Sequence, residues 1–309
     1  MAILITGAEG FVGRNLVEYF KVRGESILAP TQKELDLRSE GDVARYLRNH
    51  PVDRIVHCAT TIRQGTTYPP DTCEFNLRMF FNLERHVGDS VKLINLGSGS
   101  EYSRPFWHRK IPEDFFDRHI PEDGHSYAKY LISKYIRDKD SPNLISLRIF
   151  GIFGKYEDYR YKFISNTIVK HLLGLPIIIN QNAVYDYLYV EDFARLIEIL
   201  MKKKTAQRIF NVTPTQSIEL VRIAEIVTQV GGKPAEIRVL NEGLGLECTG
   251  DNSALLSEIG GFEFTPYEEA IGSLYEYYRG IQDGLDAQAV AQDAYLDYAK
   301  KLKNEYSKK

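Results

Sequence analysis

The sequence predicts an α/β protein in which a doubly wound parallel sheet is followed by a smaller C-terminal substrate domain. Apolar runs of strand length alternate with helical stretches through the first half of the chain, and a glycine-rich turn follows the first of these runs. Beyond Gly154 the alternation gives way to a mixed pattern of short strands and helices. Repeated strand–helix alternation places the strands in parallel and covers both faces of the sheet with helices.

The glycine-rich turn predicts a site for the diphosphate of a dinucleotide. A strand over residues 2–5 leads into Gly7, Gly10 and Gly13, and a helix follows over residues 14–20. Gly7 can take a backbone conformation that side chains forbid, Gly10 lets the main chain approach a ligand, and Gly13 lets helix and strand pack closely. The free amides and the helix dipole then favour an anion. The residues expected to contact it are Gly7, Gly10, Phe11, Val12 and Gly13.

The end of the second strand bears on the choice of dinucleotide. An acid at this place would bind the ribose hydroxyls and repel a 2'-phosphate. The strand at residues 26–29 is instead followed by Thr31 and Lys33, and Glu34 comes slightly late. We therefore favour NADP(H) over NAD(H), with Thr31 and Lys33 as phosphate partners. The alternative, a solvated loop charge at Lys33, leaves NAD(H) open.

A tyrosine and a lysine on a later helix predict acid/base chemistry. Tyr130 and Lys134 are four residues apart, so they share a helix face, whereas Tyr127 has no lysine at that distance. A nearby ammonium favours the phenolate and so tunes the phenol toward proton exchange. Ser98 directly follows a buried strand at residues 92–96. Ligands bind at the carboxyl ends of such strands, so Ser98 is expected to hydrogen-bond the substrate oxygen that Tyr130 protonates.

Taken in order, these motifs resemble the extended short-chain dehydrogenases, the NAD-dependent epimerase/dehydratase family that acts on nucleotide sugars. They are closest in pattern to the GDP-fucose synthase-like reductases of 4-keto sugars. The motifs are Thr6 with the three glycines, Asp36-Leu37, Ser98 four residues before Tyr102, and Tyr130-x-x-x-Lys134, within residues 1 to 215. The resemblance implies a Rossmann-type nicotinamide domain and a nucleotide-sugar substrate.

The resemblance also implies further site residues. Asp36 and Leu37 are expected beside the adenine, and Asn76 is expected to steady the cofactor region. Ala59 and Thr60, at the end of the third strand, join the cofactor set. The residues expected on the substrate side are Ser98, Ser100, Glu101 and Tyr185. His57, inside an apolar run, is expected to be a core residue.

The predicted reaction is the NAD(P)H-dependent reduction of a nucleotide-linked 4-keto-6-deoxy sugar, with Tyr130 as proton donor and Lys134 holding Tyr130 and the ribose. Gly99 and Ser100 stand where family dehydratases carry an Asp-Glu pair, which argues against a 4,6-dehydratase. Two alternatives stay open. One is a nucleotide-sugar 4-epimerase with tightly bound NAD, and the other is a non-catalytic protein that senses a dinucleotide.

We expect three parts along the chain. Residues 1–164 and 187–213 form the dinucleotide domain, residues 165–186 and 214–280 the substrate domain, and residues 281–309 a helical tail. The tail has apolar residues at helical spacing, which suits either a subunit contact or a loosely docked segment. A homodimer is one possibility.

Composition narrows the class of protein. The formal net charge of -3 gives no general attraction to nucleic acid or to anionic membranes, and no apolar run approaches the ~20 residues that span a bilayer. The three cysteines are an odd and scattered set, and the first strand begins too early for a signal peptide. The seven histidines form no metal-binding spacing. We therefore expect a cytoplasmic protein without a metal.

Overall fold

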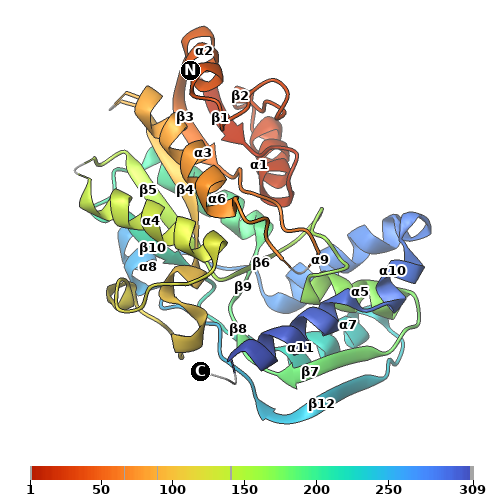
Figure 1. Ribbon diagram of the computed structural model, residues 1–309. Helices are drawn as coiled ribbons and strands as arrows, with labels where there is room; N and C mark the ends of the chain where they lie inside the picture. The colour runs from red at the N-terminus through yellow and green to blue at the C-terminus, as the bar shows by residue number, and fades with distance from the viewer. Residues whose placement is uncertain (1, 66, 89, 140, 307–309) are drawn as a thin grey trace.

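The computed structural model describes residues 2–65, 67–88, 90–139 and 141–306, and a six-stranded parallel sheet forms its centre (Figure 1). Its strand order is β10-β5-β4-β3-β1-β2. These strands are β1 (Ala2–Thr6), β2 (Ile27–Leu28), β3 (Val52–His57), β4 (Lys92–Ser98), β5 (Leu144–Ile149) and β10 (Ile209–Val212). The chain turns to opposite sides of β1 to form β2 and β3, so the topological switch point lies between β1 and β3, where doubly wound sheets bind ligands.

Helices cover both faces of this sheet, which confirms the predicted fold class. One face carries α1 (Phe11–Val22) and α6 (Val190–Lys202), and the other carries α2 (Glu40–Asn49), α3 (Thr72–His86) and α4 (Gly124–Asp138). Buried aliphatic side chains from the strands pack against both layers because a parallel sheet hides both of its faces.

A second core lies in the C-terminal half of the chain. It is built from α5 (Phe163–Leu172), α7 (Leu220–Gly231) and α9 (Tyr267–Gly280), beside the pair of β7 (Ile177–Asn182) and β12 (Ile237–Leu244). Two short pairs lead into it, β6 (Gly151–Phe153) with β9 (Tyr187–Tyr189) and β8 (Val184–Tyr185) with β11 (Ile218–Glu219). By contrast, α8 (Ser253–Ile259) places Leu255 in the core of the large sheet. The exact domain boundaries stay a prediction.

The segment after β4 packs more closely than its composition suggested. It contains three short turns, η1 (Gly99–Tyr102), η2 (Arg104–Phe106) and η3 (Glu113–Phe115). Residues 104–124 are rich in proline, aromatic and charged residues, a composition that is typical of a lid or a substrate-facing insertion. Instead Ile111 and Phe116 are buried with Tyr102 and Tyr130, and the backbone of Ile111 hydrogen-bonds with Thr249 and Asp251. Apolar burial therefore fixes this segment against α4.

The C-terminal tail is helical, as predicted, and docks on its own chain. It comprises η4 (Gln282–Gly284), α10 (Ala287–Ala291) and α11 (Ala294–Tyr306), while residues 307–309 lie outside the described residues. Figure 1 shows α11 running alongside the C-terminal core. Val290 is fully buried in that core, and Lys170 Nζ meets Asp293 Oδ2 at 2.6 Å. The tail therefore packs against the C-terminal core of its own chain. Within the described residues, no helix is both long and apolar enough to cross a membrane.

The ion pair of Lys170 and Asp293 should be a measurable anchor of the tail. Asp293→Asn keeps a residue that tolerates the positive φ of 53° at this position but leaves Lys170, 4% exposed, without its counter-charge. We expect the free energy of unfolding to fall by about 2 kcal/mol, because an unpaired buried charge is costly. Urea unfolding followed by circular dichroism measures this change. Asp297→Asn, on the exposed side of α11, is the control, and equal stability of both variants would contradict the anchoring role.

Candidate active site

The loop between β1 and α1 is shaped to receive a diphosphate. Gly7 has a φ of +64°, and a Cβ on it would lie 2.7 Å from the backbone nitrogen of Ala59. A Cβ on Gly13 would lie 2.3 Å from the carbonyl oxygen of Gly7. Gly10 is the N-cap of α1 and no side chain caps this helix, so its first amides are available to an anion. Phe11 and Val12 begin the helix beside it.

Side chains at the end of β3 hold this loop and the next one in place. His57 is buried and its Nδ1 lies 2.9 Å from Thr6 Oγ1, while burial lowers its pKa to about 3. It is a core histidine, as expected. Asn76 Oδ1 accepts hydrogen bonds from the Thr61 amide at 2.8 Å and from Thr60 Oγ1 at 3.3 Å. Asn76 thus fixes the segment that follows Ala59, at the β1/β3 switch point.

The region expected to hold the adenosine end lies beyond β2. Glu34 Oε2 accepts hydrogen bonds from the Thr31 amide and hydroxyl, at 2.7 and 2.9 Å, and Lys33 is exposed. Asp36 forms two hydrogen bonds with the Arg38 guanidinium, at 2.9 and 2.8 Å, which lower the pKa of Asp36. Leu37 is buried nearby in the sheet core. Arg38 is a second cation at this end of the site, which the sequence reasoning missed.

Ser98 lies at the carboxyl end of β4, where its hydroxyl is pre-positioned. Ser98 Oγ accepts hydrogen bonds from the Ser100 amide at 3.1 Å and the Ser100 hydroxyl at 2.9 Å. The Ser98 amide donates to Glu101 Oε1 at 2.8 Å, which completes a capping box. The two bonds from Ser100 occupy acceptor positions of Ser98 Oγ and leave its proton to be donated to a ligand.

Glu101 is a structural residue and not a substrate contact, which corrects the sequence prediction. Its side chain is fully buried, and its Oε2 accepts a hydrogen bond from Arg148 Nε at 2.7 Å. Arg148 also donates to the Tyr102 hydroxyl at 3.0 Å. The sequence shows an acid shortly after Ser98, but no local pattern indicates that its partner is Arg148 on β5, 47 residues away.

Tyr185, the remaining substrate prediction, packs against the C-terminal core. Its ring stacks on Tyr187 with centroids 5.2 Å apart, and burial raises its pKa well above the usual value. The charges and phenols that influence it come from Arg104 in η2, Cys248 before α8, and Tyr295 and Tyr298 in the tail. Tyr185 is therefore close to the tail and to η2 as well as to the C-terminal core.

One stripe of α4 faces the end of β4 and carries His125 and Lys129. These residues continue into Ile132 and Ile136, which pack in the sheet core, with spacings of four, three and four residues. Lys129 is 6% exposed, and its Nζ donates to the carbonyl oxygen of Leu96 at 2.6 Å. Burial lowers the pKa of Lys129 to about 8, and the Glu101 carboxylate opposes this shift.

Tyr130 and Lys134 lie on another stripe of α4, which corrects the predicted triad. Lys134 Nζ is 3.2 Å from the Tyr130 hydroxyl, so the two side chains do meet. Both bind Asp117: Tyr130 donates to Oδ1, and Lys134 reaches both carboxylate oxygens at 3.0 Å. Arg137 continues this stripe and also binds Asp117, at 3.2 Å.

The geometry of an α-helix separates the two pairs. Tyr130 and Lys134 each come five residues after their counterparts His125 and Lys129. Five residues rotate a side chain about the helix axis by about 140°, so Tyr130 and Lys134 point well away from the stripe of Lys129 that meets β4. Burial and the Asp117 bond raise the pKa of Tyr130, opposite to what a proton-exchanging phenol needs. The pair was predicted from its spacing, which does not reveal the face of the helix that meets the sheet.

Several buried polar atoms near the adjoining amino ends of α3 and α4 have no hydrogen-bond partner. The buried atoms without a hydrogen-bond partner include Thr72 Oγ1, Asn76 Nδ2, His125 Nδ1 and Ser126 Oγ, from the first turns of α3 and α4. Buried polar groups normally find partners, so this cluster suits a polar ligand or water. The ring of Tyr68 stacks on His125, with centroids 4.4 Å apart and planes 3° from parallel. The residues therefore fit a nicotinamide dinucleotide that runs from the glycine loop to this cluster.

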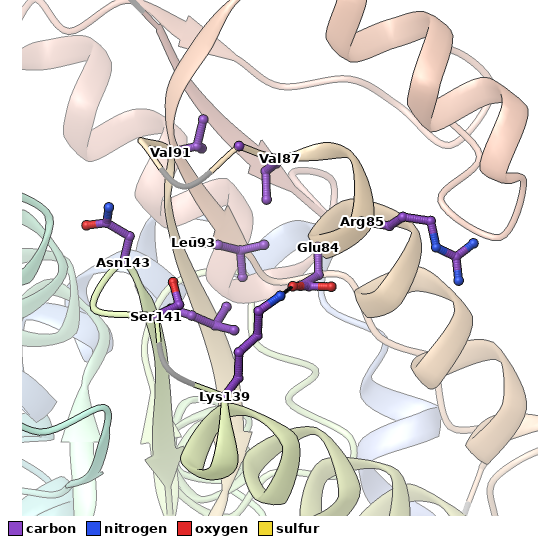
Figure 2. A pocket seen from close by; sticks show the side chains of 10 residues that line it. Glu84, Arg85, Val87, Val91, Leu93, Lys139, Ser141 and Asn143 are labelled. Carbon is purple, nitrogen blue, oxygen red and sulfur yellow. Dashed lines mark hydrogen bonds and ion pairs between the residues drawn. The ribbon is translucent and has the colours of Figure 1, made fainter.

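A separate pocket lies at the amino ends of β4 and β5, opposite to the end of β4 that carries Ser98 (Figure 2). Figure 2 shows Glu84 and Lys139 pointing toward each other across it, with Leu93 between the two segments. Its walls are the last turn of α3, the start of β4 and the chain that leads into β5. Because these are the amino ends of parallel strands, the pocket lies away from the ligand crevice of this fold.

Together the fold and the site define a class: dinucleotide-binding oxidoreductases of the short-chain dehydrogenase type. The model of the NAD dependent epimerase/dehydratase family matches residues 3–213. The chain belongs to this family and uses a nicotinamide dinucleotide.

Two curated relatives match over most of their length. The chain is 25% identical over 303 residues to the GDP-L-colitose synthase of Yersinia pseudotuberculosis, which covers 90% of this chain and 98% of the relative. It is 26% identical over 300 residues to the GDP-L-fucose synthase of Azorhizobium caulinodans, with 89% and 96% covered.

Solved structures agree in fold. The UDP-glucose 4-epimerase of Thermotoga maritima superposes with a TM-score of 0.76 at 19% identity, covering 91% of this chain and 99% of that chain. The GDP-mannoheptose C4 reductase of Campylobacter jejuni, solved with NADP bound, gives a TM-score of 0.76 at 19% identity, with 90% and 98% covered.

The close contact at Gly13 predicts a selective loss of cofactor binding. In Gly13→Ala the new methyl group must displace the Gly7 carbonyl, so the diphosphate loop shifts. We expect the Kd for NAD(P)H to rise at least tenfold, measured by the fluorescence of the reduced nicotinamide. Gly272→Ala in α9 is the control: it meets no atom within 4 Å, and it should leave binding unchanged while stabilising the helix by about 1 kcal/mol. Equal affinities of both variants would contradict the assigned diphosphate site.

Proposed function

We propose that this chain reduces the ketone of a nucleotide-linked 4-keto-6-deoxy sugar with NADPH or NADH. The observation that carries the proposal is that the carboxyl end of β4 holds both groups: Ser98 is its last residue, and the Lys129 ammonium donates to the carbonyl oxygen of Leu96, two residues earlier, at 2.6 Å. The names of the relatives support the substrate class. They include a GDP-L-colitose synthase, a GDP-L-fucose synthase and the dTDP-4-dehydro-6-deoxy-D-allose reductase of Streptomyces bikiniensis, 23% identical over 275 residues.

The roles of the residues follow from their chemistry. The bound reduced nicotinamide supplies a hydride. Ser98 donates a hydrogen bond to the ketone oxygen, since Ser100 already fills acceptor positions of its hydroxyl. Lys129 holds the hydroxyls of the nicotinamide ribose and places a positive charge next to the oxygen as negative charge develops on it. Tyr185 and Ser100 lie on the substrate side.

The proton donor predicted from the sequence, Tyr130, does not suit this role. Its hydroxyl is bound to Asp117 and Lys134 on the stripe of α4 that points away from Lys129. The proposal therefore replaces Lys134 with Lys129 as the ribose-holding ammonium and leaves Tyr130 as a structural residue. Location in the cytoplasm and pairing into a homodimer stay predictions.

A 4-epimerase is the rival in the same family. It would oxidise the sugar at C4 and return the hydride to the other face, so it would keep its NAD through every turnover. A reductase must exchange its cofactor each time. Release of the cofactor during purification and a one-to-one consumption of NAD(P)H favour the reductase, whereas retained NAD and turnover without added cofactor favour the epimerase. A dinucleotide sensor would show neither, and it has no need of a buried ammonium beside the site.

Lys129 should be required for the reaction and Lys134 should not. With a nucleotide-linked 4-keto-6-deoxy sugar, the unmodified protein should oxidise one NAD(P)H per ketone reduced. We expect Lys129→Met to lower kcat/KM at least 100-fold because the charge at the reacting oxygen is lost. Absorbance at 340 nm, with product identified by mass spectrometry, measures this rate. Lys134→Met is the matched control on the other stripe, and a greater loss there would return the site to the Tyr130 face.

Lys33 should set the preference for NADPH. It is exposed beyond β2, where the 2'-phosphate of NADP would lie. Lys33→Glu places like charges together, and we expect the Kd for NADPH to rise about tenfold, or about 1.4 kcal/mol, while the Kd for NADH changes less than twofold. Fluorescence titration measures both values. Lys21→Glu, exposed near the end of α1, makes the same change of net charge as a control. An equal rise in the Kd values for NADPH and NADH would overturn the NADP(H) assignment.

A further inference from the structure

We propose that the imidazole of His125 donates the proton to the ketone oxygen and is resupplied by the ammonium of Lys129. This inference rests on the proposed function, and it assigns the step that Tyr130 cannot perform from its place on α4. The three polar side chains gathered around the carboxyl end of β4 are then Ser98, His125 and Lys129.

Position is the first argument. Lys129 Nζ is 2.6 Å from the carbonyl oxygen of Leu96, two residues before Ser98 in the same strand. His125 is one helical turn before Lys129 on the same stripe of α4, and residues four apart on a helix are neighbours. The first turn of α4 lies against the first turn of α3, since a Cβ on Gly124 would be 3.6 Å from the Cβ of Cys73. His125 therefore follows directly on the contact between the amino ends of these two helices.

The state of the imidazole is the second argument. Its Nδ1 is buried and has no hydrogen-bond partner among the described residues, whereas Tyr68 covers one face of its ring. A buried core histidine would normally satisfy both nitrogens, as His171 does with Tyr275 and the Lys233 carbonyl. His125 is thus held by stacking while Nδ1 is left open to exchange a proton.

The surrounding charges decide which group stores the proton. Burial and the Lys129 ammonium lower the pKa of His125 to about 3, so the ring is neutral at pH 7. The titratable and charged groups that face it are Lys129 in α4, Asp123 before α4, Arg104 in η2, and Arg63 and Tyr68 in the loop after β3. Lys129, with its pKa lowered to about 8, is the acid matched to neutral pH.

The step balances as follows. The ketone carbon accepts the hydride and a C–H bond forms, while the electron pair of the C=O π bond moves to oxygen. That oxygen takes the N–H proton of the His125 imidazole, and the other ring nitrogen takes a proton from the Lys129 ammonium. The ketone becomes an alcohol, the nicotinamide is oxidised, and the neutral Lys129 amine regains a proton from water.

The decisive comparison is between the two stripes of α4. His125→Phe removes the proton but keeps a flat ring for Tyr68, and we expect kcat to fall at least 100-fold with little change in the Kd for NAD(P)H. His125→Gln, which hydrogen-bonds but does not relay a proton, should lose as much. Tyr130→Phe should stay within about twofold of the unmodified protein. Full activity in His125→Gln, or a greater loss in Tyr130→Phe, would overturn the inference while the reductase stands.

A second measurement does not depend on turnover. Nitrogen-15 NMR of labelled histidine should show the His125 ring staying neutral from pH 8 down to pH 5. In Lys129→Met the pKa of that ring should rise, since the cation that opposes its protonation is gone. A ring that titrates near 6.5 in both proteins would overturn the coupling of His125 to Lys129. If no keto sugar is reduced by the unmodified protein, the proposed function fails, and this titration still tests the coupled pair.

Discussion

The buried ammonium of Lys129 is the constraint on which the site depends. It is 6% exposed, and among the described residues its Nζ donates a hydrogen bond to a backbone carbonyl, Leu96 O, and to no carboxylate. A cation taken out of water without an ion pair is costly, and the lowered pKa of Lys129 records that cost. A chain that evolved for stability alone would place an apolar residue here, as it does at Ile132 and Ile136 on the same stripe. The proposed binding of an anionic dinucleotide beside Lys129 would offset this cost.

The ion pair of Glu101 and Arg148 plays the complementary part. It is fully buried, and it ties the turn after β4 to the neighbouring strand β5. Glu101 also accepts a hydrogen bond from the Ser98 amide, so the backbone that carries the Ser98 hydroxyl is held by a fully buried charge pair. Rigid support of this kind is what a hydrogen bond to a reacting oxygen requires, because a displacement of one ångström weakens it strongly.

The sequence was sufficient for those features that local patterns determine. The glycine turn, the alternating strands and helices and the helical tail follow from short-range chemistry, and the structure has them. The face of α4 that meets the sheet does not follow from spacing. Two pairs of polar residues with the same four-residue spacing, His125 with Lys129 and Tyr130 with Lys134, occupy one helix. The signal that separates them was present: the stripe of His125 and Lys129 continues into isoleucines, while that of Tyr130 and Lys134 continues into Arg137. The apolar residues that continue the stripe of His125 and Lys129 therefore indicate that this pair is the one that faces the sheet.

Long-range contacts account for the rest of the site, and they link its two ends. The guanidinium of Arg63 lies 5.6 Å from the ring of Tyr68, which covers His125, and 4.5 Å from the ring of Tyr298 in the tail. Tyr298 and Tyr295 also raise the pKa of Tyr185, which packs against the C-terminal core. The loop after β3 and the C-terminal helix are more than two hundred residues apart in sequence, yet Arg63 lies near an aromatic ring of each. The tail therefore reaches the loop whose Tyr68 stacks on His125, because Tyr298 on α11 lies against the guanidinium of Arg63.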